Sequence, residues 1–370
     1  MSPTPSHAWW RPVTLTAAVW LLALAAGLAA WGAQPEAWFL PGQRYALPGL
    51  HARPGEGYDG QFVLYMALDP RPATVAPHLD VPAYRYQRVL LPWLAHWLGQ
   101  GHPQGVLAAV LVLNLLGHLA GTAVVAWRLA AWGRPSGWAL LYGLWPGLLF
   151  AARVGLPEPL AYGLALLAWR AHEARRPALA AGLYLAAALT KEVTLALAAA
   201  QAVAVLAQRR PRAAWPLLAA GLGWLGWQTW LKATFGTVGF AAGGAGATGW
   251  EVVPLGGLLR VALQNPRLGL VYGLVFGPAY GVPIVVAARQ VLRQGRAALR
   301  DPYALLLAVH LGLALFLPHS TWREPFAVLR VLTGLLLSFW LYEVRGGHWA
   351  VLRRLTPFWA AQAAFLLARG

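Results

Sequence analysis

Between residues 57 and 88 the chain reads GYDGQFVLYMALDPRPATVAPHLDVPAYRYQR, inside the one long polar interval of this sequence. The sequence on either side of the interval is made largely of apolar runs. An apolar run of about 20 residues is typical of a helix that spans a membrane. The first such run, Val13–Ala33, directly precedes the interval. We therefore expect residues 34–103 to form a first loop on the far side of a membrane, carrying short amphipathic helices.

The composition also points to a membrane protein. Of the 370 residues, 59% are hydrophobic and only 11% are charged, whereas soluble proteins carry about 25% charged residues. The apolar runs lack the short alternation of barrel strands, so their backbone hydrogen bonds must be made within helices. We predict an all-α polytopic bundle, with residues 1–370 as a single integral membrane domain. The chain has no cysteine, which excludes disulfides, thiolate catalysis and cysteine-bound metals.

Hydrophobic windows predict about eleven spans in all. After Val13–Ala33 they lie near Gln104–Ala126, Gly137–Ala152, Glu158–Ala171, Ala178–Thr190, Val193–Ala207, Ala213–Leu231, Leu268–Ala288, Pro302–Leu317, Phe326–Leu341 and Trp349–Leu367. Arginines cluster in every second connection, which is the positive-inside pattern and predicts a cytoplasmic N-terminus. The net charge of +17 is thereby explained by topology. A nucleic-acid partner is not expected, because no basic soluble module is present.

Short segments within the connections also carry expectations. Helices are predicted at Gly60–Leu68, which ends before Pro70, and at Tyr84–Leu98. Both are too short to span a bilayer, so we expect them to lie along the membrane surface. The Gly/Ala-rich segment Phe240–Trp250 is either a lid over a cleft or a plain connector.

Asp59 allows two interpretations. It stands at the start of a predicted helix, where a carboxylate caps the first turn and suits the helix dipole. Alternatively, it lies in a cavity at the membrane surface and takes the proton from an acceptor hydroxyl as a general base. Gly57 and Gly60 would then leave the backbone open to close substrate approach.

Basic residues near this loop suit a phosphate. Arg85 and Arg88 are three residues apart, hence on one face of the predicted helix, and can contact phosphate in bidentate fashion. They could equally reach out to lipid headgroups. Lys191 and Glu192 are expected at a tight outer turn. Either the two side chains form an ion pair with each other, or Lys191 contacts a phosphate and Glu192 orients the Lys191 side chain.

A further group of residues is expected to line or support a cleft. Glu158 also favours a helix N-terminus, and Asp69 also ends a helix before Pro70. The histidines show no metal-ligand spacing such as HExxH, so no metal site is predicted and no cofactor is certain; a divalent metal is left open. The cleft residues are Tyr58, Gln61, Asp69, Glu158, Glu192, His319, Arg323 and Glu324.

The run GYDGQFVLYMALDP, followed by YRYQRVLLPWLA, resembles the first outer loop of bacterial polytopic proteins related to GT-C glycosyltransferases. Within that superfamily it is most similar to the mannosyltransferase-like members, including PIG-V-type proteins. The resemblance is strongest over residues 55–100. It has weaker support from Glu158-Pro159-Leu160, Thr190-Lys191-Glu192 and Trp322-Arg323-Glu324-Pro325. Many members carry paired acidic residues in this loop, whereas here a predicted helix separates Asp59 from Asp69, which speaks against metal binding.

The resemblance implies transfer of a single sugar, by inversion, from a polyprenyl-phosphate donor to a lipid, glycan or protein acceptor. Asp59 would be the general base on the outer face of a bacterial inner membrane, with Arg85, Arg88 and Lys191 on the donor phosphate. One alternative is a transporter or lipid flippase whose outer charges line a pathway. Transporters typically show internal repeats and midplane charges, which this sequence lacks. Another alternative is an envelope assembly protein without chemistry.

Overall fold

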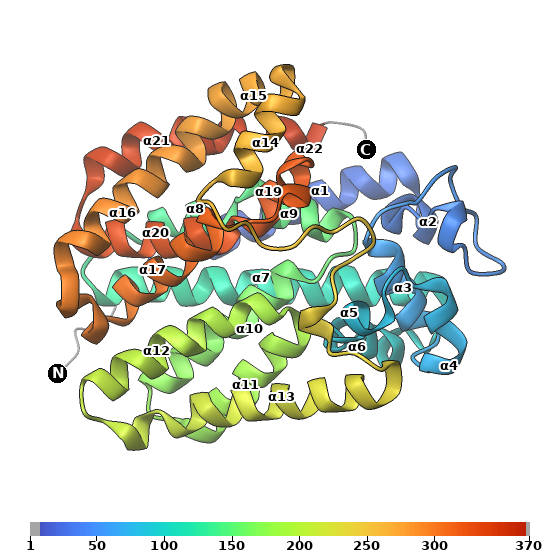
Figure 1. The fold of residues 1–370 in the computed structure, drawn as a ribbon, viewed down its shortest axis with the longest axis horizontal. Helices are drawn as coiled ribbons and strands as arrows, with labels where there is room; N and C mark the ends of the chain where they lie inside the picture. Colours follow the sequence, from blue (N-terminus) through green and yellow to red (C-terminus); the bar gives the residue numbers. More distant parts are fainter. Residues whose placement is uncertain (1–7, 368–370) are drawn as a thin grey trace.

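The computed structural model describes residues 8–367, and these residues form helices and connecting turns with no β-strand. The all-α prediction is confirmed. Figure 1 shows the longer helices running side by side along the long axis of the molecule, with α2 to α6 gathered at one end. The predicted cytoplasmic N-terminus, residues 1–7, lies outside the described residues.

The first half of the chain contains α1 (Arg11–Trp31), α2 (Pro35–Phe39), α3 (Gly60–Leu68), α4 (Pro72–Val75), α5 (Pro82–Tyr86), α6 (Leu90–Gly99), α7 (Pro103–Ala131), α8 (Leu140–Gly143), α9 (Pro146–Arg153) and α10 (Glu158–Glu173). The second half contains α11 (Pro177–Thr190), α12 (Leu195–Ala207), α13 (Trp215–Phe235), α14 (Gly256–Gln264), α15 (Pro266–Val271), α16 (Val282–Gln294), α17 (Pro302–Leu315), α18 (His319–Trp322), α19 (Pro325–Val331), α20 (Thr333–Gly346), α21 (Trp349–Ala361) and α22 (Ala364–Leu367).

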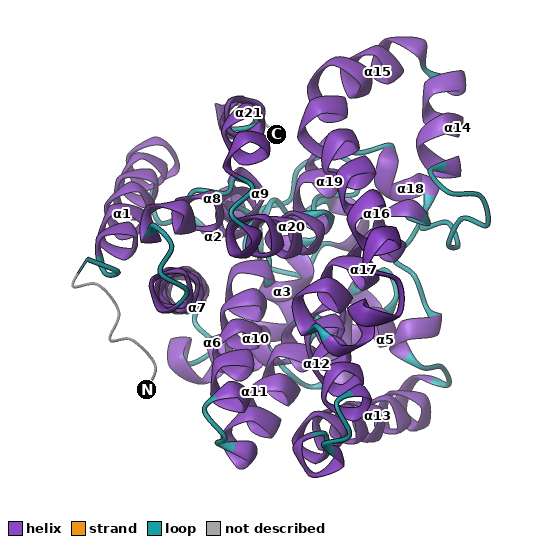
Figure 2. Cartoon of the chain, turned by 90° about the vertical axis from the view of Figure 1, so that its left-hand side faces the viewer, coloured by secondary structure: helices purple, strands orange, loops and turns teal. Residues whose placement is uncertain are grey.

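Helix α7 organises the packing, and Figure 2 shows it end-on with α1, α6 and α10 around it. Small residues let α7 and α10 approach closely, as in membrane helix pairs. A Cβ on Gly163 would stand 1.9 Å from the carbonyl oxygen of Gly117. The Asn114 side chain donates to the Leu156 carbonyl (3.0 Å) and accepts from the Leu160 backbone N–H (3.3 Å). These contacts fix the start of α10, where Glu158 lies.

The predicted outer loop shares a hydrophobic core with α7 and with single residues of α10 and α13. Helix α3 has the predicted bounds, but it does not lie on a surface, because every residue from Gly60 to Ala67 is buried. Helix α6 differs, since Trp97 is 77% exposed on its outer face. The second predicted helix, Tyr84–Leu98, is in fact two, α5 and α6, separated at Gln87–Val89. The expectation of two surface helices is therefore wrong for α3.

Two helical segments in the second half are bent. A π-helical stretch at Tyr272–Gly281, which contains Pro278, joins α15 to α16. A proline inside a helix removes a backbone hydrogen bond and clashes with the preceding turn, which accounts for the irregular winding. Helices α19 and α20 meet at an angle of 44°. This bend directs Arg330, near the end of α19, toward α3 and α10.

Three segments of the described chain are long and apolar enough to cross a membrane, namely Arg11–Trp31, Pro103–Ala131 and Pro266–Arg300. The bent pair α19–α20 adds a fourth if it counts as one span. The predicted count of about eleven is therefore not confirmed. Several other predicted spans form shorter apolar helices, among them α11, α12 and α17.

The arginine-rich connections meet at one end of the bundle. The Arg134 guanidinium donates to the Arg345 carbonyl (3.0 Å), Gln208 donates to the Arg300 carbonyl (2.7 Å), and Arg345 pairs with Asp301 (2.6 Å). Connections that the sequence assigns to one side of a membrane thus contact one another. Helices α2 to α6 lie at the opposite end (Figure 1).

Candidate functional site

Asp59 immediately precedes α3, yet its side chain makes no capping hydrogen bond to that helix. Instead, Oδ1 accepts from Nη2 of Arg85 at 2.9 Å, and Oδ2 lies 4.0 Å from Nη2 of Arg330. The capping interpretation of Asp59 is therefore wrong. The carboxylate is held between two guanidinium groups that come from distant parts of the chain.

The flanking glycines serve packing and do not open the backbone to a substrate. A Cβ on Gly60 would stand 2.0 Å from the Val154 carbonyl oxygen, and one on Gly57 would stand 2.3 Å from the Gly42 nitrogen. Gly57 also has φ of +75°, a conformation that glycine adopts at little cost. The expectation that these glycines admit a substrate is wrong, because protein backbone already occupies the space.

Arg85 is shared between two carboxylates. It lies on α5 and makes a bidentate pair with Asp80, from Nε to Oδ1 and from Nη2 to Oδ2, each at 2.7 Å. Its guanidinium carbon also lies 4.3 Å from the ring centroid of Phe62 on α3, a cation–π contact. Asp80 therefore fixes the orientation of the guanidinium that faces Asp59.

On the other side of Asp59, the Glu158 carboxylate bridges two cationic side chains. Oε1 of this fully buried carboxylate accepts from Nζ of Lys191 (2.5 Å) and from Nη1 of Arg330 (3.1 Å). Lys191 does not pair with its neighbour Glu192, so the predicted mutual pair is wrong. Glu158 does begin α10 as expected, but it also links Lys191 and Arg330 at the centre of the site.

Arg88 and Glu192 form a second, adjacent pair. Arg88 donates to both carboxylate oxygens of Glu192, at 2.9 and 2.6 Å, and to the hydroxyl of Tyr84 at 2.9 Å. Because α5 ends at Tyr86, Arg85 and Arg88 do not share a helix face, which corrects the sequence argument. They contact different carboxylates but line the same cavity.

We call these eight charged residues the Asp59 cluster: Asp59, Asp80, Arg85, Arg88, Glu158, Lys191, Glu192 and Arg330. It holds as many carboxylates as cations, so it is close to neutral. The Asp59 side chain is the most accessible member at 38% exposure, whereas the others range from 0 to 24%. The cavity beside it has a volume of only about 30 Å³, roughly that of one water molecule in the liquid.

The charges keep Asp59 ionised. Burial alone raises the pKa of the Asp59 carboxyl, but the charges of Arg85 and Arg330 outweigh that effect and lower the pKa to about 2. The pKa of Asp80 is likewise lowered, because its hydrogen bonds and charge interaction with Arg85 outweigh burial. Both groups are thus carboxylates at neutral pH and can accept a proton.

Two buried side-chain atoms in the cluster lack hydrogen-bond partners within the described structure. They are Oε2 of Glu158 and Nε of Arg330, both buried. Buried polar atoms are usually satisfied by protein or ordered water. Both residues line the cavity, and each keeps one hydrogen-bonding atom that no described protein group satisfies.

The Gly/Ala-rich segment Phe240–Trp250 contacts the cluster. The backbone N–H of Ala245 donates to Oδ2 of Asp80 at 2.9 Å, and Nη2 of Arg323 donates to the Gly246 carbonyl at 3.3 Å. Figure 1 shows this loop, between α13 and α14, passing in front of α5. Thr248 also exchanges hydrogen bonds with Ser320. The loop therefore lies against the cluster, and whether it acts as a lid or as a connector stays a prediction.

The predicted cleft residues His319, Arg323 and Glu324 lie outside the cavity, and His319 and Arg323 contact this loop or the residue that follows it. The backbone N–H of His319 donates to Glu251 at 3.1 Å, and Arg323 contacts the loop as described. Glu324 precedes α19 without capping it through its side chain. None of these three residues lines the small cavity. The charge of Glu324 nevertheless acts on Tyr58 and Arg330, which flank Asp59, so the role of this group in a cleft stays a prediction.

The remaining predicted residues have structural contacts. Gln61 accepts from the Gly42 N–H (3.0 Å) and donates to the Glu56 carbonyl (2.8 Å), which ties residues 42–56 to α3. Tyr58 packs edge-on against Phe150 and beneath Arg330. Asp69 pairs with Arg71 (2.6 Å) at the far end of α3.

Sequence reasoning missed Arg330 and gave Asp80 little weight. Arg330 lies inside the predicted span Phe326–Leu341, and an ionisable residue within an apolar span is by default a functional candidate. That signal was available. Asp80 carried no such signal, because its role depends on a contact with Arg85 that only the fold creates.

The described residues contain no group of three or more histidines and carboxylates placed to hold a metal ion. Comparisons with protein-family models, with curated proteins and with solved structures found no match. The chemistry of the site therefore has to be argued from its geometry.

Proposed function

We propose that this chain is a membrane glycosyltransferase that moves one sugar from a polyprenyl-phosphate donor to an acceptor hydroxyl, with Asp59 as the general base. The observation that carries the proposal is the position of Asp59. It is the most exposed charged group of the cluster, it faces the cavity, and guanidinium groups stand at both of its oxygens. A base beside cations that can bind a leaving phosphate is what such a displacement requires.

The proposed step is a single displacement. The acceptor hydroxyl gives its proton to Asp59 as its oxygen forms a bond to the anomeric carbon of the sugar. The bond from that carbon to the phosphate oxygen breaks, and the electron pair leaves with the phosphate, which becomes a monoester with one more negative charge. Attack from the side opposite the leaving group inverts the anomeric centre.

The ion pairs of the Asp59 cluster can respond both to the proton that Asp59 takes up and to the negative charge that the leaving phosphate gains. While Arg85 neutralises Asp59, the carboxylate is a weak base, because its pKa is held at about 2. A donor phosphate competes for the same guanidinium, and weakening of the pair raises the basicity of Asp59. When Asp59 takes the proton it no longer holds Arg85, which is then available to the doubly charged leaving group. Arg330 is placed to act in the same way from the other side.

The small cavity requires movement before a sugar donor can bind. Ala245 reaches Asp80 through one backbone hydrogen bond, so displacement of this part of the loop Phe240–Trp250 would open the Arg85 side of the cluster, while the contacts of Gly246 with Arg323 and of Thr248 with Ser320 anchor the rest of the loop. We assign the role of lid to this loop. Lid closure over a reacting centre excludes water, which otherwise competes with the acceptor for the sugar.

We further propose a GT-C-like membrane arrangement with about eleven spans, in which the arginine-rich end faces the cytoplasm and the Asp59 cluster lies toward the outer face of a bacterial inner membrane. Helices such as α11, α12 and α17 have 13 or 14 residues, hence lengths of about 20 Å, less than the roughly 30 Å of a bilayer core. The cluster at their outer ends would then lie in a recess below the lipid surface, where a polyprenyl chain can enter from the side.

A transfer assay tests this proposal. The purified full-length protein in lipid nanodiscs is given radiolabelled polyprenyl-phosphate mannose or glucose, with a membrane-lipid extract as acceptor. We expect Asp59→Asn to lower turnover by at least about 100-fold, the usual contribution of a general base. The matched control is Asp69→Asn, which removes a carboxylate at the other end of α3 and should stay within about twofold of wild type.

Full turnover by Asp59→Asn would contradict the assigned base. If wild type itself transfers no sugar, whereas protein-containing vesicles accumulate or flip a labelled lipid, the transporter alternative replaces this proposal. Thermal unfolding of each variant separates a lost base from a lost fold.

A further inference from the structure

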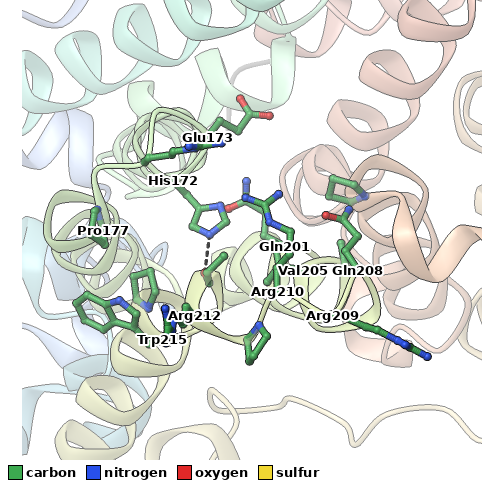
Figure 3. Close-up of a pocket in the computed structure, with 16 residues that line it drawn as sticks. His172, Glu173, Pro177, Gln201, Val205, Gln208, Arg209, Arg210, Arg212 and Trp215 are labelled. Carbon is green, nitrogen blue, oxygen red and sulfur yellow. Dashed lines mark hydrogen bonds between the residues drawn. The ribbon is translucent and has the colours of Figure 1, made fainter.

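A second and much larger pocket lies at the arginine-rich end of the bundle, away from the Asp59 cluster. It has a volume of about 840 Å³ and opens between the ends of α10 and α12 and the starts of α11 and α13 (Figure 3). Glu158 begins α10 and Glu173 ends it, so this pocket lies about 22 Å from the cluster at 1.5 Å per helical residue. It is a separate site.

Four exposed arginines line this pocket, and none of their guanidinium groups has a carboxylate or hydrogen-bond partner within residues 8–367. They are Arg175, Arg209, Arg210 and Arg212. Other arginines at this end do have partners, such as Arg128 with Glu173 and Arg345 with Asp301. Arg289, Arg293 and Arg296 are also exposed at this end, but they lie outside the pocket. The four arginines of the lining differ from them because they surround one concave site.

The single carboxylate in the lining does not neutralise these charges. Glu173 pairs with Arg128 and accepts from the hydroxyl of Tyr303 (3.2 Å) and from Nε1 of Trp169 (3.1 Å). These partners lie on α7, α17 and α10. Figure 3 shows Glu173 on the opposite side of His172 from Arg212 and Trp215. The pocket is thus strongly positive.

A buried amide also faces the pocket. Gln201 on α12 is only 3% exposed, and its Oε1 accepts from the hydroxyl of Tyr184 at 2.7 Å. Its amide nitrogen has no protein partner in the part of the chain that the structure describes. Gln201 lines the pocket, where this amide can donate a hydrogen bond to water or to a ligand. An anion in the pocket would accept it.

The wall of the pocket is fixed in place. Nε2 of His172 lies 2.8 Å from the Ala213 carbonyl, the dashed line in Figure 3. This hydrogen bond ties the turn before α13 to the end of α10. Held in this way, the turn that carries Arg210 and Arg212 keeps its position relative to Gln201.

Two of the arginines occupy backbone positions that favour glycine. Arg175 and Arg209 have φ of 57° and 59°, and each is followed by Arg and Pro in turns of the same build. A third turn at this end, Gly133-Arg134-Pro135, has glycine in the equivalent position with φ of 67°. Arginine at a strained position suggests that the side chain is needed there.

We propose that this pocket binds the phosphate group of an anionic membrane-lipid headgroup. Guanidinium groups bind phosphate in bidentate fashion, and the Gln201 amide supplies a neutral donor at the floor. Trp215, which lines the pocket and is 50% exposed, is the residue type that lies at headgroup level. Basic pockets between helices at a membrane surface accommodate phospholipid headgroups.

The test compares two triple variants of the full-length protein in nanodiscs that mix phosphatidylglycerol with phosphatidylcholine, with bound lipid counted by native mass spectrometry. One replaces Arg209, Arg210 and Arg212 with Gln. The matched control replaces Arg289, Arg293 and Arg296, which are exposed at the same end, lie outside the pocket and lose the same charge. We expect the triple variant of Arg209, Arg210 and Arg212 to lower the affinity for phosphatidylglycerol by at least about tenfold, and the control triple variant to lower it by less than about threefold.

A second variant avoids a change in surface charge. Gln201→Glu keeps the acceptor for Tyr184 but places a carboxylate at the floor of the pocket, so we expect it to abolish preferential phosphatidylglycerol binding without changing phosphatidylcholine binding. Equal effects of the two triples, or full binding by Gln201→Glu with an unchanged melting temperature, would overturn the proposal. Displacement of the lipid by inorganic phosphate or glycerol phosphate at equal affinity would assign the pocket to a soluble phosphate and overturn the lipid source.

Discussion

Glu158 has no access to solvent, and its one bonded oxygen contacts both Lys191 and Arg330. Glu158→Gln would leave these two cations facing each other without a counter-charge. Removal of one member of a buried ion pair costs about 3–5 kcal/mol. We expect a clear fall in the thermal unfolding midpoint of the detergent-purified protein.

The control for Glu158→Gln is Glu56→Gln, since Glu56 pairs with Arg44 and both side chains are more than half exposed. An exposed pair contributes about 0–1 kcal/mol, so the midpoint should hardly move. Equal midpoints for the two variants would show that Glu158 does not hold the site together.

The pKa of Asp59 predicts how its contribution to stability depends on pH. Folding lowers this pKa from 3.8 to about 2, so the folded state favours the ionised carboxyl. That stabilisation is fully present above about pH 4 and is lost as the pH falls toward 2. The difference in free energy of unfolding between wild type and Asp59→Asn should therefore shrink across this range in denaturant titrations. A difference that stays constant from pH 6 to pH 2 would show that Arg85 and Arg330 do not hold the carboxylate ionised.

Among the elements, α3 depends on its first residue. Gly60→Ala would place a methyl group 2.0 Å from the Val154 carbonyl oxygen, and backbone cannot yield as a flexible side chain does. Overpacking of this kind costs about 1–3 kcal/mol, and the shift of α3 would carry Asp59 away from Arg85. We expect a lower melting temperature and weaker transfer activity.

Helix α11 offers the matched control for Gly60→Ala. Gly182 is also helical, but a Cβ there meets nothing within 4 Å. Gly182→Ala should stabilise the protein by about 0.5–1 kcal/mol, because alanine loses less backbone freedom on folding. A Gly60→Ala variant that behaves like Gly182→Ala would mean that α3 does not pack against residue 154 as described.

The elements also show what the sequence could and could not predict. Helix α3 was predicted with its observed bounds, because Asp59, Gly60 and Pro70 mark both ends. The break between α5 and α6 was missed, although Pro92 signals it: proline cannot donate to the Arg88 carbonyl, so a helix does not continue through this point. The pairing of Asp59 with Arg330 lies beyond sequence reasoning, since it depends on how distant helices pack.

At the scale of the whole molecule, the arrangement of charges predicts an orientation. The arginine-rich connections gather at one end, and α2 to α6 lie at the other (Figure 1). Asp59 directly precedes α3 and Arg85 lies on α5. Positive connections stay on the cytoplasmic side of a membrane. Of the described segments, only Arg11–Trp31, Pro103–Ala131, Pro266–Arg300 and the bent pair α19–α20 are long and apolar enough to cross, so the orientation needs a direct measurement.

The absence of cysteine from the sequence makes single introduced cysteines specific reporters of this orientation. Val252 is 90% exposed just before α14 at the proposed outer end, and Arg296 is exposed in the turn after α16 at the proposed inner end. A membrane-impermeant maleimide should label Val252→Cys in intact spheroplasts and Arg296→Cys only after permeabilisation. Both should react in detergent, which confirms that each thiol is accessible. If Arg296→Cys alone were labelled in intact spheroplasts, the bundle would have the opposite orientation in the membrane. Asp59 would then lie on the cytoplasmic side, where a donor on the outer face could not reach it.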